Sequence, residues 1–257
     1  MLLAEPGQTA YDLHFKVLGF PVRVHPLFWL LGLILGFNVE QPIVVLIAIC
    51  VAFVSILVHE LGHSLMMRRF GRESHIVLYI MGGLAIEGNG SSFGGFRSRG
   101  SRTTYEQVLI SAAGPAAGFV LAAIVVAVLY AMGGRIVTSP GLIPMPVPIL
   151  GNDLDEIAQN YNLMVMFHLL LQFNIMWGLL NLLPVFPLDG GQIAQAVMVA
   201  KDPWNGLARS LWLSVFTGAI VAVVGGLILQ NLLMAMLFGS MAYSSYLALQ
   251  QIGGGGR

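Results

Sequence analysis

Two histidines and a glutamate stand inside a stretch that otherwise excludes charge. They form the sequence His59-Glu60-Leu61-Gly62-His63. On a helix, positions four apart lie on one face, so both imidazoles can reach one metal ion, and Glu60 can act as a base toward a metal-bound water. Ionisable groups in an apolar span are costly and are typical of functional sites. The pattern therefore predicts a catalytic zinc site.

A catalytic zinc takes three protein ligands and leaves a fourth position for water. The third ligand must come from elsewhere in the chain. The residues with a suitable atom are Glu73, Glu87, Glu106, His168 and Asp189. His168 is expected to be a hydrogen-bonded packing residue or a gate residue rather than a ligand.

Asp189 is favoured by its surroundings. Pro184 and Pro187 precede it and must end or break a helix, because proline lacks an N–H and fixes φ. We expect the chain to run extended past the metal site there. Gly190 and Gly191 should then permit a sharp turn into a helix over 192–200. The alternative, in which Asp189 caps that helix, stays open at this stage.

The composition indicates a membrane protein. The chain has 257 residues with 12 Lys+Arg and 12 Asp+Glu, whereas a soluble chain of this length carries roughly 64 charged residues. Mean hydropathy is +0.82. The zero net charge also argues against nucleic acid as a partner, because no excess of basic residues exists to neutralise phosphates.

Apolar runs predict about six transmembrane helices, with short membrane-associated strands near residues 15–25 and 75–80. The candidate spans are 26–39, 42–67, 105–132, 162–183, 207–229 and 231–250. In this arrangement all of the 12 basic residues except Arg135 fall on one side, which predicts cytoplasmic N- and C-termini. The stretch 88–102 is expected to be flexible, and 133–161 to be an irregular outer loop.

Together these motifs resemble the site-2 protease family of intramembrane zinc metalloproteases, peptidase family M50. The resemblance rests on the His-Glu-x-x-His motif and on Asn181-x-x-Pro184-x-x-x-x-Asp189-Gly190. Gly82-Gly83 and Ala113-Gly114-Pro115 support it. One departure is Gly118, where family members often carry asparagine, so Gly114 and Gly118 are interpreted as a small-residue packing face.

The resemblance implies a single integral-membrane protease domain over 1–257. Its catalytic core is roughly 12–200, residues 201–257 add further helices, and no PDZ or CBS module is expected. The family's chemistry implies one zinc bound by His59, His63 and Asp189. It makes Glu60 the catalytic base and lets Asn181 assist binding of the substrate or of the oxyanion.

The resemblance also implies a substrate that is a transmembrane helix of another protein, cleaved in regulated intramembrane proteolysis. The helix must unwind first, and the extended segment could pair with the strand at 75–80. Residues expected to contact substrate are Val77, Leu78, Gly82, Gly83, Asn174 and Pro184. The partner is expected to be a single-pass protein such as an anti-sigma factor or a membrane-held transcription factor.

The same analogy places the protein in the plasma membrane of a prokaryote, with a site that opens to the cytoplasm. Other classes of protein fit this sequence less well. A membrane protease resembling the CaaX-processing enzymes would need a later glutamate ligand in an E-x-x-x-H-like context, which this sequence lacks. A transporter would spread its charges over several spans. A catalytically silent relative would have lost one of the four key residues.

Overall fold

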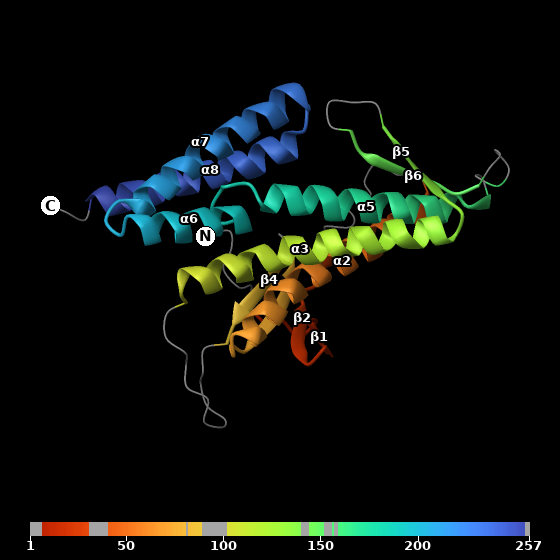
Figure 1. The fold of residues 1–257 in the computed structure, drawn as a ribbon, viewed down its shortest axis with the longest axis horizontal. Helices are drawn as coiled ribbons and strands as arrows, with labels where there is room; N and C mark the ends of the chain where they lie inside the picture. The colour runs from red at the N-terminus through yellow and green to blue at the C-terminus, as the bar shows by residue number, and fades with distance from the viewer. Residues whose placement is uncertain are drawn as a thin grey trace. The chain divides into compact units, whose positions relative to one another are not determined.

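The computed structural model describes residues 7–30, 41–80, 82–88, 102–139, 144–151, 156 and 159–254. It is mostly helical, with one four-stranded and one two-stranded sheet (Figure 1). This confirms the predicted class of a helical membrane protein with a few short strands. The chain divides into two compact units, the first from residues 1–99 and 113–178 and the second from 100–112 and 179–257.

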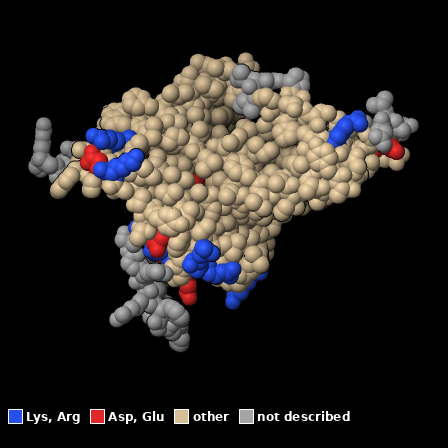
Figure 2. Space-filling view, viewed as in Figure 1, with Lys and Arg blue, Asp and Glu red and all other residues tan. Residues whose placement is uncertain are grey.

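Five described helices are long and apolar enough to cross a membrane. The spanning segments are α2 (Pro42–Arg69), α3 (Thr104–Ala131), α5 (Tyr161–Asn181), α7 (Gly206–Val223) continued by the π-helical turn η1 (Val224–Ile228), and α8 (Leu232–Gly254). Each matches a predicted span closely. The sixth predicted span, 26–39, falls mostly outside the described residues. Figure 2 shows that charged side chains occupy few places on the face in view.

In the first unit, α2 packs against both α3 and α5. A methyl group added at Gly62 of α2 would meet the carbonyl oxygen of Ala113 and lie 2.8 Å from Cβ of Ala117, so the two helices approach closely. Asn174 of α5 donates a hydrogen bond to Ser55 of α2. Small residues at such contacts are typical of membrane helices, because they let backbones come together.

The four-stranded sheet packs on the same helix. It consists of β1 (Leu13–Val17), β2 (Phe20–Val24), β3 (Ser74–Tyr79) and β4 (Gly82–Glu87), in the order β1-β2-β3-β4. The strands β2 and β3 are parallel, and the other two pairs are antiparallel. Its buried face includes Val22, Ile76 and Leu78, which cluster with Ile56 and Leu61 of α2. The sheet thus covers the part of α2 that carries the His-Glu-x-x-His motif.

Two parts of the sheet structure were not expected from the sequence. The strand β4 forms where Gly82-Gly83 opens a short segment before the Gly-rich stretch. The stretch 133–161, predicted to be irregular, contains β5 (Arg135–Thr138) paired with β6 (Pro146–Ile149). Pro146 and Pro148 lie in an edge strand of a two-stranded sheet, where a missing N–H can face away from the partner strand. The prediction of a wholly irregular loop was therefore wrong.

The second unit contains α6 (Asp189–Lys201) and the antiparallel pair α7 and α8 (Figure 1). The sequence predicted an extended segment before α6, but this segment is folded into tight turns. The N–H of Leu182 donates to the carbonyl of Leu179, and the N–H of Leu183 donates to the carbonyl of Leu180. The N–H of Leu188 donates to the carbonyl of Val185. The first two turns follow directly from the end of α5, before Pro184, whereas the third contains Pro187. The turns pack on the first turn of α6.

Candidate active site

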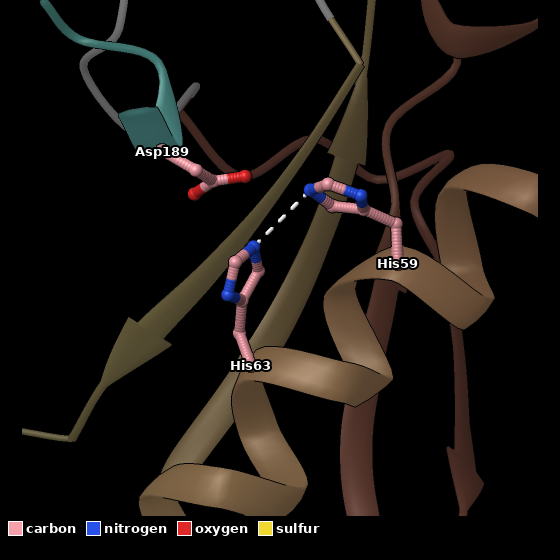
Figure 3. A group of neighbouring side chains, drawn as sticks. All are labelled: His59, His63 and Asp189. Carbon is pink, nitrogen blue, oxygen red and sulfur yellow. Dashed lines mark hydrogen bonds between the residues drawn. The ribbon is translucent and has the colours of Figure 1, made fainter. Parts of the chain in front are cut away.

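The two motif histidines lie on one face of α2 with their rings against each other (Figure 3). Their Nε2 atoms are 3.1 Å apart, and both side chains are buried. Two nitrogen ligands of a tetrahedral zinc with bonds of about 2.0–2.1 Å lie about 3.3 Å apart. The imidazole pair is therefore spaced as zinc requires, without a change of backbone.

A glycine on the neighbouring helix α3 makes room for the imidazoles. A methyl group at Gly114 would lie 2.8 Å from Nε2 of His59 and still closer to the ring of His63. The backbone of α3 thus forms the wall beside both nitrogens. Gly118, four residues on, faces Asn174 at an ordinary distance of 3.4 Å from Cβ to Oδ1. Of the two glycines in the predicted small-residue face, Gly114 therefore contacts the candidate metal site and Gly118 does not.

Glu60 is buried beside the start of β4. A methyl group at Gly83 would lie 2.7 Å from Oε1 of Glu60. Because no side chain stands at this position, the carboxylate rests directly against the backbone of β4. Gly82 has φ of +119°, which favours glycine, and its Cα faces the Trp177 ring of α5. The double glycine therefore serves both the turn from β3 and the space for the Glu60 carboxylate.

Asp189 is the first residue of α6 and is buried. The N-cap is Leu188, and no side-chain capping hydrogen bond is present, so the capping alternative is not what the structure shows. Gly190 and Gly191 lie within α6 and do not form the sharp turn that was predicted. A methyl group at either would collide with the backbone of the preceding turns, at Leu182 or Val185. These glycines allow close packing of the first helical turn.

His59, His63 and Asp189 each offer one ligand atom, and these atoms lie within 4.8 Å of one another (Figure 3). The donor set of two imidazoles and a carboxylate is a common catalytic zinc set. The residues present therefore fit a zinc ion. His168, the histidine of α5, is not in this group. Its Nδ1 is buried without a hydrogen-bond partner among the described residues, and its role as a packing or gate residue stays a prediction.

The other predicted residues have varied surroundings. Asn181 is the last residue of α5, and Pro184 lies half-buried in the turns that follow. Asn174 is buried, and its amide nitrogen donates to Ser55 and to the carbonyl of Leu170. Its donors are therefore used within the protein.

Val77 and Leu78 are fully buried in β3, which is paired on both sides by β2 and β4. An added peptide strand cannot pair with it, so the predicted docking strand was wrong. Among the described strands of this sheet, β1 and β4 are the edges.

Sequence reasoning missed three polar residues that pair with partners far away in the sequence. Ser55 lies one helical turn before His59 and is paired with Asn174, but a serine in a membrane helix carries no distinct signal. Gln107 and Gln192 bond to each other across 85 positions of the sequence. No local pattern connects two such distant residues.

A family model decides the assignment. The model described as peptidase family M50 matches residues 47–224, which include both motifs. The chain belongs to peptidase family M50. The predicted family is thereby confirmed.

Several relatives agree with this assignment. A protein named zinc metalloprotease from Methanocaldococcus jannaschii is 26% identical over 228 residues, covering 86% of this chain and 56% of that protein. A putative zinc metalloprotease from Synechocystis sp. is 28% identical over 194 residues, covering 73% of this chain and 41% of its own length. The chain thus spans about half the length of the curated relatives it matches.

The fold has a match among solved structures. The site-2 protease from Methanocaldococcus jannaschii superimposes with a TM-score of 0.53 at 23% identity, covering 93% of this chain and 95% of that one. At this identity the likeness concerns the fold. Family, relatives and a side-chain group able to hold a metal all agree with the prediction of a zinc metalloprotease-type membrane protein.

Proposed function

We propose that this M50 protein is an intramembrane zinc metalloprotease that hydrolyses a peptide bond in or near the transmembrane helix of a membrane protein. The observation that carries the proposal is the imidazole pair of His59 and His63, whose Nε2 atoms lie 3.1 Å apart on a membrane-spanning helix. Glu60, which stands between them in the sequence, is buried as well. A buried ionisable cluster in such a helix is typical of a functional site.

The ligands proposed for zinc are His59, His63 and Asp189, one zinc per chain. A zinc ion held by these residues would supply Lewis-acid activation of water and of the scissile carbonyl. The Glu60 carboxylate takes the proton of the attacking water and passes it to the leaving amine. The amide of Asn181 stabilises the oxyanion of the substrate.

The substrate is proposed to bind as an extended strand at the free edge of β4, which here means the edge that pairs with no other described strand. This replaces pairing with β3, whose two edges are occupied. The support is that Gly83 at the start of β4 lies against Glu60, so a strand added at this edge would run near the catalytic base. Gly82 and Gly83 remain proposed substrate contacts, whereas Val77 and Leu78 only hold β4 in place by pairing with it in the sheet.

The proposed partners and location follow from family analogy. The substrate is a single-pass membrane protein, such as an anti-sigma factor or a membrane-held transcription factor, released by regulated intramembrane proteolysis. The protein resides in the plasma membrane of a prokaryote, with both termini cytoplasmic and the site open to the cytoplasm. The distribution of basic residues supports this orientation.

The first test is the metal content of the full chain purified in mild detergent. Wild type and His168→Ala are expected to bind one zinc per chain, and Asp189→Ala is expected to lose it. His168→Ala is the matched control because this histidine lies outside the candidate group. Zinc retained in Asp189→Ala would refute the proposed ligand set.

The second test separates a protease from a silent relative. Wild type and Glu60→Gln are each co-expressed with a set of single-pass membrane proteins tagged at the cytoplasmic end. We expect wild type to release the tag and Glu60→Gln to release none, with the same zinc content in both proteins. A protein that binds these partners but releases no tag in either form would contradict the proposed activity.

A further inference from the structure

A chain of side-chain hydrogen bonds runs through the second unit and ends just before Asp189. Nη1 of Arg102 donates to Oε1 of Gln107 at 2.9 Å. Nε2 of Gln107 donates to Oε1 of Gln192 at 3.0 Å, and also to Oγ of Ser111 at 3.0 Å. Nε2 of Gln192 then donates to the carbonyl of Pro187 at 3.2 Å. This amide relay connects the start of α3 to the turns that precede α6.

The relay has one possible direction. A guanidinium donates and cannot accept, and a backbone carbonyl accepts and cannot donate. Oε1 of Gln107 must therefore face Arg102, which directs its Nε2 toward Gln192. Oε1 of Gln192 accepts that bond, which leaves its Nε2 to donate to Pro187. Rotating either amide by 180° would break bonds on both sides, so each end of the relay fixes the orientation of the next group.

Gln192 holds the two carbonyls that come directly before Asp189. Its side chain bonds the carbonyl of Pro187, and its backbone N–H donates to the carbonyl of Leu188 at 2.9 Å. No side chain caps the start of α6. The orientation of the first turn of α6, and with it the Asp189 carboxylate, thus depends on how firmly this segment is held.

We propose that Gln192 is a positioning residue for Asp189, oriented by Gln107 and Arg102 through the amide relay. This inference rests on the proposed function, because it takes Asp189 as a zinc ligand. Partners that orient a metal ligand typically change metal affinity by about 10–100-fold when removed. The relay lies in the wall of a cavity of about 420 Å³ that is also lined by Gln195. Gln195 is one turn further along α6 and makes no hydrogen bond in the relay, so it supplies a matched control.

The test is the zinc affinity of the purified full chain, measured by competition with a chromogenic zinc chelator. Gln192→Leu is expected to weaken zinc binding about 10–100-fold. Gln192→Glu, which has the same length but cannot donate to the carbonyl of Pro187, should be weakened at least as much. Gln195→Leu should bind zinc like wild type. Equal affinities of the Gln192→Leu and Gln195→Leu proteins would overturn the proposal.

The direction of the relay is tested with Gln107→Leu and the double variant. Gln107→Leu should weaken zinc binding less than Gln192→Leu, and the double variant should equal Gln192→Leu, because Gln107 acts through Gln192. Additive effects of the two substitutions would overturn the relay. The thermal midpoint of the zinc-free proteins serves as a separate readout. A purely structural role of Gln192 would lower that midpoint without changing zinc affinity, and would also overturn the proposal.

Asp189→Ala distinguishes this inference from the proposed ligand set. If Asp189→Ala keeps its zinc, the ligand assignment has failed. If Asp189→Ala loses zinc while Gln192→Leu binds it normally, the ligand assignment stands and the positioning role of Gln192 has failed.

Discussion

The amide nitrogen of Asn174 on α5 donates a hydrogen bond of 2.9 Å to the hydroxyl of Ser55 on α2. Both side chains are buried, and Ser55 lies one helical turn before His59. The bond therefore holds two membrane helices together directly beside the metal-binding motif. Polar bonds of this kind between membrane helices contribute about 0.6–2 kcal/mol.

Replacing Asn174 by leucine should destabilise the protein. The substitution removes the donor to Ser55 and the side-chain hydrogen bond to the carbonyl of Leu170. We therefore expect the free energy of unfolding to fall by about 1–3 kcal/mol. Denaturant unfolding in detergent measures it. Asn162→Leu is the control, because Asn162 is exposed in the first turn of the same helix. Equal stability of the two variants would contradict this role of Asn174.

Gly114→Ala should weaken zinc binding, because a methyl group there would collide with the Nε2 atoms of His59 and His63. We expect an affinity lower by at least the roughly tenfold seen when groups around a metal ligand are disturbed. Gly118→Ala is the matched control on the same helix, since its methyl group would meet Asn174 at 3.4 Å. Zinc titration of both proteins measures the difference, and equal affinities would show that α3 yields without disturbing the imidazoles.

Gly83→Ala should slow hydrolysis while leaving zinc in place. The added methyl group would lie 2.7 Å from Oε1 of Glu60 and would push the carboxylate aside. A displaced general base loses its contribution of roughly 10²–10⁴-fold in rate. Gly88→Ala is the control, because its methyl group would meet Glu73 at 3.8 Å. Cleavage of a tagged membrane protein, with zinc content measured in parallel, checks the prediction.

Local sequence patterns predicted the parts of this molecule that depend on local geometry. The spacing of His59 and His63 sets their common face through the helical period, and the apolar runs set the bounds of the long helices. The strands over 13–24 and 74–79 follow from β-branched and aromatic residues. Each of these features is decided within a few residues, so the sequence is sufficient to find it.

Features that depend on distant contacts were not predictable. Gly190 is needed because the backbone of Leu182 packs directly on it. From the sequence alone, a glycine required for close packing looks the same as a glycine required for a turn. The bond between Gln107 and Gln192 joins residues of ordinary type in two helices. The interior position of β3 depends on β4, a strand that begins with two glycines and was hidden by their low strand propensity.

Proline substitutions in β4 test whether its free edge binds substrate. Leu84 and Ala85 are adjacent, so their N–H groups point to opposite edges of the strand. Proline at the position facing β3 removes a bond of the sheet, whereas proline at the other position removes a donor from the free edge. We expect one of the two variants to keep zinc and its thermal midpoint but to lose most cleavage of the tagged substrate. Val77→Pro, in the interior strand, should instead lower the thermal midpoint together with activity. Normal cleavage in both β4 variants would mean that the substrate does not pair with this edge.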